Sequence, residues 1–247
     1  MLKTMTTEYL DEARLDALSA REFQTSHPFP WVNPQGLLTE EGFARLIETL
    51  PEVDMFDRIF GKARKFGQQS HDRFALEYHS DLQLSKPWSD FIAELEGPVY
   101  RGFLRRMFGT DGFSLRYHWH YTPNGCSVPP HCDSRHKLGS HIFYLNTDQD
   151  WQAGWGGQTL VLDDNGRFSA SSNPGFADFD SAMGSEAMGN RSLLFGRKGN
   201  SWHGVKEITC PEDALRKVFI VVLESNVIQR AGQRLASWLR PAGGSAH

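Results

Sequence analysis

The chain has 247 residues, of which 39% are hydrophobic and 23% are charged, and it contains 17 Phe, 7 Trp and 6 Tyr. This composition supplies enough apolar side chains for a packed core and excludes a largely disordered chain. The net charge of −4 has the wrong sign for a surface that collects nucleic-acid phosphates. The sequence has no apolar run near the roughly 20 residues of a membrane span, and its acidic N-terminus lacks the apolar centre of a signal peptide. We therefore expect a soluble cytoplasmic protein that binds neither nucleic acid nor membrane.

In the first part of the chain, residues 1–112, apolar side chains recur at helical spacing. Thr39 is placed to cap a helix that Pro51 ends. A second helix is predicted to begin after Ser85, and a third to end at Gly109. This part therefore predicts a helical flank that packs on, and supports, the rest of the domain.

After Gly112 the hydrophobic period changes from helical to alternating. Many short apolar runs separated by turn residues are typical of a sandwich, jelly roll or barrel. The fold class that follows is mainly β with a helical flank, or α+β, with the β core in residues 113–225. The predicted strands are the alternating segment 115–121 and the runs 141–146, 158–162, 191–195 and 217–223.

Two other segments do not follow this strand pattern. Residues 163–190 are rich in Gly, Ser, Asp and Asn, and they exceed the roughly 12–15 residues beyond which structureless loops become uncommon. They predict either a lid at a substrate entrance or a disordered insertion. Residues 226–247 combine an amphipathic helical stripe with a Gly/Ser tail. We expect one structural domain made of the flank, the β core and this C-terminal segment.

Half of the histidines, five of ten, lie between residues 118 and 141. Among them, His131 is two residues from Asp133, so in a strand both side chains lie on one face and can bind one ion. A second His from a neighbouring strand would complete two imidazoles and one carboxylate. Non-haem Fe(II) oxygenases use this ligand set because it leaves positions open for cosubstrate and O₂. His203, after a later apolar strand, is the best candidate.

A cation is also needed if the cosubstrate has two carboxylates. 2-Oxoglutarate chelates iron through its keto-acid end, and Arg provides bidentate geometry for the other end. Arg216 begins a strand that is apolar on both faces, where a charge lies either at an exposed end or in a pocket. Lys217, which projects to the opposite face, is the second candidate.

Taken together, these motifs resemble the Fe(II)- and 2-oxoglutarate-dependent oxygenases of the prolyl 4-hydroxylase superfamily, which includes the hypoxia-factor prolyl hydroxylases. The resemblance extends from Tyr121 to Leu223, with the motifs in the same order. They are Tyr121-Thr-Pro-Asn-Gly, His131-Cys-Asp133, Ile142-Phe-Tyr-Leu-Asn146, Asp150-Trp151, Trp155-Gly-Gly-Gln-Thr-Leu160, Arg191-Ser-Leu-Leu-Phe195, His203-Gly-Val205 and Arg216.

The resemblance implies a double-stranded β-helix, a cupin-like jelly roll, supported by the N-terminal helices. It implies that iron is bound by three catalytic residues, and that three others bind or adjoin the cosubstrate. The iron ligands are His131, Asp133 and His203. At the cosubstrate, Arg216 assisted by Tyr144 would hold the distal carboxylate of 2-oxoglutarate, and Tyr121 would lie nearby.

The activity that the resemblance implies is hydroxylation of an aliphatic carbon. It requires Fe(II), 2-oxoglutarate and O₂, with ascorbate as an optional reductant, and it releases succinate and CO₂. Related halogenases lack the metal-binding carboxylate, so Asp133 favours hydroxylation. The substrate stays open between a prolyl residue of a protein or peptide and a free amino acid or other small metabolite.

Two alternatives to an oxygenase follow from the same residues. A zinc-stabilised module is one, because thiolate and imidazole ligands suit zinc. A non-catalytic jelly-roll binding module is the other, although it would be expected to have lost an iron ligand or Arg216. His118 and His120, two apart on one face, are interpreted as substrate contacts. The candidate zinc ligands are Cys126, His131, Cys132 and His136.

Overall fold

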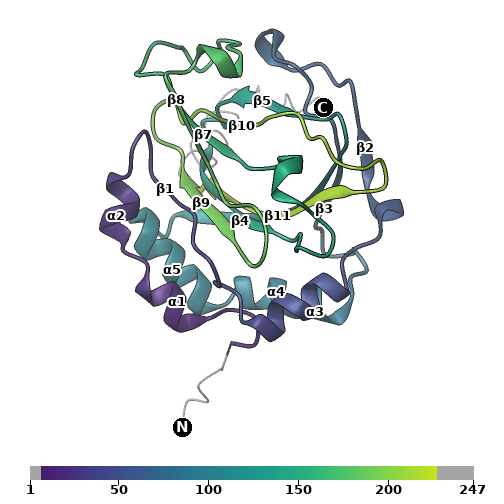
Figure 1. Ribbon diagram of the computed structural model, residues 1–247. Helices are drawn as coiled ribbons and strands as arrows, with labels where there is room; N and C mark the ends of the chain where they lie inside the picture. The colour runs from purple at the N-terminus through teal and green to yellow at the C-terminus, as the bar shows by residue number, and fades with distance from the viewer. Residues whose placement is uncertain (1–6, 227–247) are drawn as a thin grey trace, which may run out of the picture.

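The computed structural model describes residues 7–226, and these residues form two antiparallel sheets with helices on one side (Figure 1). The larger sheet has the strand order β1-β9-β6-β11-β4-β3-β2, and the smaller has the order β5-β10-β7-β8. The five α-helices lie against the outer face of the larger sheet (Figure 1). The predicted mainly β fold with a helical flank is confirmed.

The bounds of the elements are as follows. The α-helices are α1 (Glu12–Ala17), α2 (Ala20–Thr25), α3 (Glu40–Glu48), α4 (Lys86–Leu95) and α5 (Pro98–Phe108). The strands are β1 (Trp31–Val32), β2 (Asp57–Ile59), β3 (Arg73–Glu77), β4 (Phe113–Pro123), β5 (Val128–His131), β6 (Lys137–Tyr144), β7 (Leu160–Asp163), β8 (Ser181–Gly184), β9 (Ser192–Gly196), β10 (His203–Val205) and β11 (Leu215–Ser225). Four short 3₁₀ helices are η1 (Val53–Met55), η2 (Lys65–Gly67), η3 (Ala153–Trp155) and η4 (Phe176–Asp178).

Three helices begin or end at residues that the sequence predicts: α3 after Thr39, α4 after Ser85 and α5 at Gly109. The Thr39 hydroxyl accepts a hydrogen bond from the Gly42 amide at the start of α3, 3.0 Å away. At the end of α5, Gly109 adopts a left-handed conformation with φ of 69°, and its amide donates to the Arg105 carbonyl. The predicted caps are therefore confirmed at Thr39 and Gly109.

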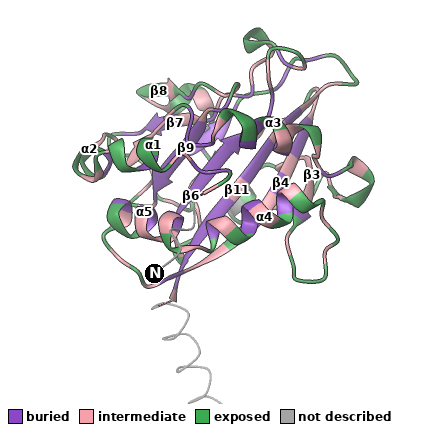
Figure 2. Cartoon of the chain, turned by 90° about the horizontal axis from the view of Figure 1, so that it is seen from below, coloured by how far each residue is buried: buried purple, intermediate pink, exposed green. Residues whose placement is uncertain are grey.

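The core between the helices and the larger sheet is aromatic. Trp88 on α4 packs against Trp119 on β4 and against Phe219 on β11, with both pairs of ring centroids 5.1 Å apart. Figure 2 shows the buried central strands beneath the helices. Because this face of β4 and β11 is taken up by packing, the opposite face is the one that can line a cavity between the sheets.

The flank is less purely helical than its sequence indicates. Within it, β1 pairs with β9, while β3 pairs with β4 and with β2. These strands are short, and β2 and β3 each include two charged residues, so they lack the apolar run that identifies a strand. The spacing of His131 and Asp133 predicts a strand at this point, and β5 forms there, although it ends at His131 and contains Pro129 and Pro130. It forms at the edge of the smaller sheet, where a missing amide donor is tolerated.

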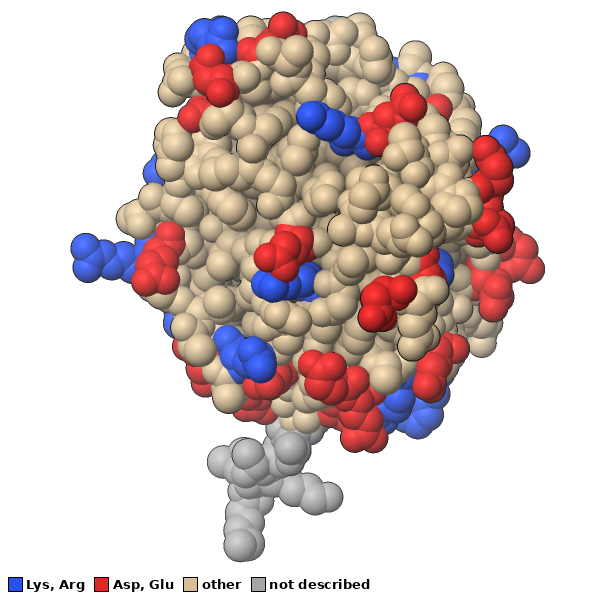
Figure 3. Space-filling model, viewed as in Figure 1, with Lys and Arg blue, Asp and Glu red and all other residues tan. Residues whose placement is uncertain are grey.

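The Gly/Ser-rich segment 163–190 is ordered, so the disordered interpretation is wrong. β8 pairs with β7, and Arg167 donates hydrogen bonds to Asp180 and to the Asp178 carbonyl. The C-terminal amphipathic stripe predicted beyond residue 226 lies outside the described residues. Among residues 7–226, no helix has the length and apolar character that crossing a bilayer requires. On the face seen in Figure 3, basic and acidic side chains are interspersed.

Gly139 on β6 is predicted to be essential for the pairing of β6 with β9. A Cβ added there would lie 2.2 Å from the Phe195 carbonyl oxygen and 2.7 Å from the Phe108 ring. Gly139→Ala should therefore lower the free energy of unfolding by about 1–3 kcal/mol or more, measured by urea denaturation. Gly102→Ala on α5 is the matched control, because a Cβ there meets nothing within 4 Å. It should raise stability by up to about 1 kcal/mol, and equal stability of the two variants would contradict this packing.

His141 on β6 is predicted to make stability fall in acid. The side chain is fully buried, with Nδ1 2.9 Å from the Tyr100 hydroxyl, and burial lowers its pKa from 6.5 to about 3. As the pH falls from 6.5 toward about 3, His141 binds a proton in the unfolded chain but not in the folded chain. The free energy of unfolding should therefore decrease by up to about 1.4 kcal/mol per pH unit. His141→Gln should reduce this slope in urea titrations between pH 7 and pH 4, and an unchanged slope would contradict the assignment.

Candidate metal centre and its cavity

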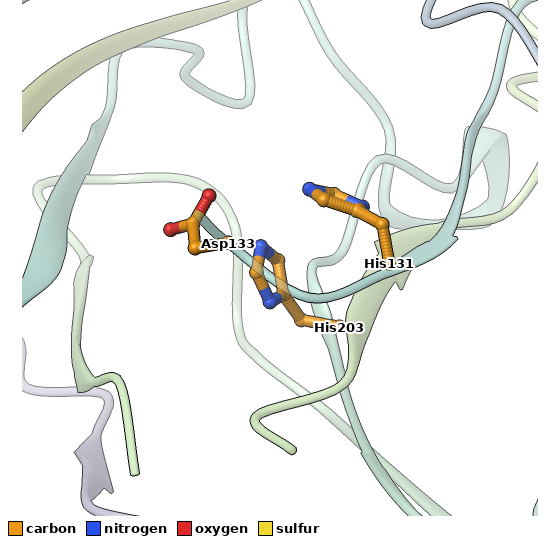
Figure 4. Close-up of side chains that lie close together, drawn as sticks. All are labelled: His131, Asp133 and His203. Atoms are coloured by element: carbon orange, nitrogen blue, oxygen red, sulfur yellow. The ribbon is translucent and has the colours of Figure 1, made fainter. Parts of the chain in front are cut away.

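The three predicted iron ligands converge at one end of the smaller sheet (Figure 4). His131 ends β5, His203 begins β10, and the two are direct partners in the strand register. Each of the three residues offers one ligand atom, a ring nitrogen from each histidine and a carboxylate oxygen from Asp133. These three atoms lie within 4.8 Å of one another. Within residues 7–226 this is the one group of three or more His, Cys, Asp or Glu side chains with such geometry.

The backbone around Asp133 differs from the one that the sequence predicts. β5 ends at His131, so Asp133 lies in the following loop rather than on the same strand. Its position there is fixed by polar contacts instead of strand alternation. Arg197 donates to the Asp133 carbonyl over 2.9 Å, and Lys137 donates to the Asp133 carboxylate over 2.8 Å.

Both histidines are held in the tautomer that a metal needs. The Nδ1 atom of His131 lies 3.0 Å from the Pro129 carbonyl, and that of His203 lies 2.9 Å from the Ser201 carbonyl. A carbonyl oxygen can only accept, so each Nδ1 carries the proton and each Nε2 has a free lone pair. Burial lowers the pKa of both rings, which keeps them neutral at pH 7. Neutral imidazoles are the form that binds metal ions.

Asp133 is held in its anionic form. Burial alone would raise the pKa of this carboxyl, but the charge of Lys137 and the hydrogen bonds from Lys137 and Ser140 lower it below its usual value. A buried carboxylate beside two neutral imidazoles is a set of one anionic and two neutral ligands. This set fits a divalent first-row metal and matches the two-His, one-carboxylate arrangement with open coordination positions.

A cavity of about 620 Å³ adjoins the triad between the two sheets. The face of β4 that looks into it carries His118 and His120, and their role as substrate contacts stays a prediction. The opposite face of β4 carries the aromatic side chains that pack under the helices. No residue of the segment 163–190 lines this cavity.

Tyr121 does not reach the cavity, which contradicts the cosubstrate position that the resemblance implies. Its hydroxyl donates to the Pro51 carbonyl over 3.1 Å, and its ring lies 4.3 Å from that of Phe56. The cause is strand alternation: on β4, Tyr121 shares a face with Trp119, which is packed in the core, and His120 is on the cavity face.

Alternation on β11 separates the two candidate cations. Arg216 projects into the cavity, while Lys217 projects to the other face, where its Nζ pairs with Asp150 over 2.9 Å. Arg216 is 6% exposed, its Nε donates to the Gly157 carbonyl over 2.6 Å, and one Nη donates to the Thr159 hydroxyl over 3.3 Å. Among the described residues it has no acidic partner, and burial lowers its pKa.

Tyr144 and Gly157 hold Arg216 in place. The guanidinium carbon lies 5.7 Å from the centre of the Tyr144 ring, and the Tyr144 hydroxyl donates to Thr159 over 3.0 Å. Gly157 has a φ of 89°, and a Cβ there would lie 3.2 Å from the Arg216 side chain. Only glycine suits this position, because both the conformation and the close approach disfavour a side chain. The structure thus brings Arg216 and Tyr144 together as expected.

Sequence reasoning missed the wall of the cavity that comes from the flank. Arg64 and His71 precede β3, Arg73 begins it, and all three line the cavity. The His71 ring lies 4.4 Å from that of His131, at a steep angle. Arg73, Ala75 and Glu77 alternate with Phe74 and Leu76, which is the sign of a strand in a flank that otherwise predicts helices.

The structure does not assemble the alternative zinc site. Neither Cys126 nor Cys132 belongs to the metal-binding group, and His136 lies at the protein surface, 3.7 Å from Glu224. Burial raises the pKa of the Cys132 thiol to about 12, so it is protonated at pH 7. This thiol is therefore not a ready nucleophile.

Comparison with known proteins finds similarity in structure only. No protein-family model matches the chain, and no curated protein matches it by sequence. A prolyl-4-hydroxylase from Pseudomonas putida is similar with a TM-score of 0.58 and 14% identity, over 87% of this chain and 98% of that one. A prolyl hydroxylase from Trichoplax adhaerens, solved with a peptide fragment of the hypoxia-inducible factor oxygen degradation domain, has a TM-score of 0.62 and 13% identity, over 89% and 93%. This chain has the prolyl hydroxylase fold.

The same fold occurs in enzymes with other activities. The non-heme α-ketoglutarate-dependent epimerase SnoN from nogalamycin biosynthesis is similar with a TM-score of 0.58 and 13% identity, over 87% of this chain and 82% of that one. The double-stranded β-helix expected from the sequence is thereby confirmed. Since one fold supports several reactions, the activity has to be argued from the cavity itself.

Metal binding should depend on the triad and not on the alternative zinc ligands. Asp133→Ala and His203→Ala should each lose tight, one-to-one Fe(II) binding in anaerobic calorimetry, because each removes one of three ligands. His136→Ala and Cys126→Ser should bind Fe(II) as the unaltered protein does. Loss of binding in either control, with retention in His203→Ala, would place the metal elsewhere.

Proposed function

We propose that this protein is an Fe(II)- and 2-oxoglutarate-dependent dioxygenase that hydroxylates an aliphatic carbon and releases succinate and CO₂. The proposal is carried by one observation: a two-His, one-carboxylate cluster shares a cavity with a buried arginine that has no acidic partner among the described residues. The cluster fits iron, and the arginine fits the distal carboxylate of a dicarboxylic cosubstrate.

In this proposal, His131 and His203 bind Fe(II) through Nε2, and Asp133 binds it through a carboxylate oxygen. The carbonyls of Pro129 and Ser201 keep the rings oriented by accepting from Nδ1. Bound iron supplies the activation of O₂ and the oxidative decarboxylation of 2-oxoglutarate. The chain orients the reactants for this chemistry and needs no side chain as a general base.

Arg216 binds the distal carboxylate of 2-oxoglutarate in this proposal, through the guanidinium nitrogens that the protein leaves free. The Gly157 carbonyl and the Thr159 hydroxyl fix the guanidinium plane, and the Tyr144 ring packs beside it. A buried cation without a counter-ion is costly, so an anion that fills the site restores the balance of charge. Val218 and Ile220 beside Arg216 add apolar wall, which excludes water from the reacting groups.

The substrate is proposed to be either a prolyl residue of a protein or peptide or a free amino acid or other small metabolite. The peptide complex of the Trichoplax enzyme supports the first class, and the metabolite chemistry named for SnoN supports the second. O₂ is the second cosubstrate, ascorbate serves as an added reductant, and the protein is proposed to act in the cytoplasm. A binding module that had lost catalysis would be expected to lack a ligand or Arg216, yet all four side chains line this cavity.

The cosubstrate role of Arg216 can be tested against its neighbour in the sequence. Anaerobic addition of 2-oxoglutarate to the Fe(II)-loaded protein should produce a visible charge-transfer band. Arg216→Gln should weaken 2-oxoglutarate binding by tenfold to more than a hundredfold, because a charge-assisted hydrogen bond contributes about 1.5–3 kcal/mol. Lys217→Gln, on the opposite face, should bind it as the unaltered protein does. Equal affinity in Arg216→Gln would contradict this part of the proposal.

A further inference from the structure

The cavity holds more positive charge than iron and 2-oxoglutarate account for. Of its basic side chains, Lys137 pairs with Asp133, and Arg116 pairs with Glu77 and Glu224. Arg64 and Arg73 make no ion pair with any residue between 7 and 226. The basic side chains in the lining are Lys62, Arg64, Arg73, Arg116, Lys137 and Arg216, and the acidic ones are Asp57, Glu77 and Asp133.

The strand register separates Arg73 from the arginine assigned to 2-oxoglutarate. Phe74 on β3 lies opposite Tyr121 on β4, so one step further in this antiparallel register sets Arg73 opposite Thr122. Thr122 in turn pairs with Arg216 on β11. Arg73 and Arg216 thus occupy the same row and the same face, two strands apart, or about 10 Å between their backbones. They are distinct cation sites in one cavity.

The donors of Arg73 are only partly satisfied. One Nη donates to the His71 carbonyl over 2.7 Å, whereas the buried Nε has no hydrogen-bond partner. Burial, followed by the charge of Arg64, lowers the pKa of Arg73. The positive charges of Arg64 and Arg73 repel each other, and the buried Nε of Arg73 lacks a hydrogen-bond partner. An anion bound by both side chains would relieve both costs.

The position of Arg64 ties this pair to the proposed metal. A nitrogen of its guanidinium donates to the His71 ring, and that ring packs on His131. A ligand held by Arg64 and Arg73 therefore lies beside the metal ligands, where the bond to be oxidised must be. The cavity volume of about 620 Å³ is in the range that encloses small molecules.

We propose that the substrate of this enzyme is a small organic acid whose carboxylate is bound by Arg73 and Arg64 while Arg216 binds 2-oxoglutarate. This inference rests on the proposed function and chooses between its two substrate classes. An internal prolyl residue presents neutral amides on both sides and leaves this pair of arginines without an anion. A free carboxylate satisfies them with bidentate, charge-assisted hydrogen bonds.

The test uses the full chain loaded with Mn(II) and saturated with 2-oxoglutarate, so that Arg216 is occupied. N-acetyl-L-proline and benzoate are titrated by calorimetry, each beside its neutral amide. Each acid should bind at least about tenfold more tightly than its amide. Arg73→Gln should remove this preference, and Arg73→Lys should restore part of it. Arg58→Gln is the matched control, because Arg58 is an exposed cation on β2, in the same hairpin, and lies outside the cavity lining.

Equal affinity for acid and amide, or a preference that survives Arg73→Gln, would overturn the inference. So would loss of 2-oxoglutarate binding in Arg73→Gln with retention in Arg216→Gln, because Arg73 would then be the cosubstrate anchor. The same titrations are repeated on the metal-free Arg216→Gln variant, and this measurement requires neither iron nor 2-oxoglutarate. Two results together would refute the proposed function and still support the anion site. They are an acid preference in metal-free Arg216→Gln that depends on Arg73, and the absence of any complex of iron and 2-oxoglutarate in the unaltered protein.

Discussion

The pairing of β11 with its two neighbours sets the positions of the groups in the cavity. β11 pairs with β4 along eleven residues and with β6 on its other side, which fixes both its register and its faces. Packing of Phe219 against Trp88 then directs one face to the helices and leaves Arg216 on the other. A slip of one residue would exchange Arg216 for Lys217 in the cavity, so the site depends on the packing of a core that it does not touch.

Electrostatics gives the cavity its chemical character. Asp133 is its buried acid and pairs with Lys137 beside the two histidines, while three guanidiniums face the same space without acidic partners among the described residues. Such an arrangement is costly in the absence of ligands and strongly favours anions. The proposed metal, cosubstrate and substrate each reduce this cost, so they are expected to stabilise the folded chain by mass action as they bind.

Most of the core and the triad could be predicted from the sequence, because apolar runs and motif order carry that information. The end of β5 at His131 and the loop position of Asp133 could not be predicted, since polar contacts rather than periodicity place this carboxylate. Tyr121 shows a different failure. Its alternation with Trp119 assigns it to the packed face, whereas the resemblance implies a position near the cosubstrate. The contribution of β3 to the cavity could not be predicted, because the face of β3 toward the cavity is polar. Pairing with β4, more than local propensity, makes this segment a strand.

The most direct test of this account is a crystal structure of the full chain grown anaerobically with Mn(II) and 2-oxoglutarate. The account predicts one metal ion bound by His131, Asp133 and His203, with both histidines coordinating through Nε2. It also predicts the distal carboxylate of 2-oxoglutarate on Arg216, with Arg73 free to bind a second anion. A metal ion bound elsewhere, or 2-oxoglutarate absent from Arg216 at saturating concentration, would contradict it.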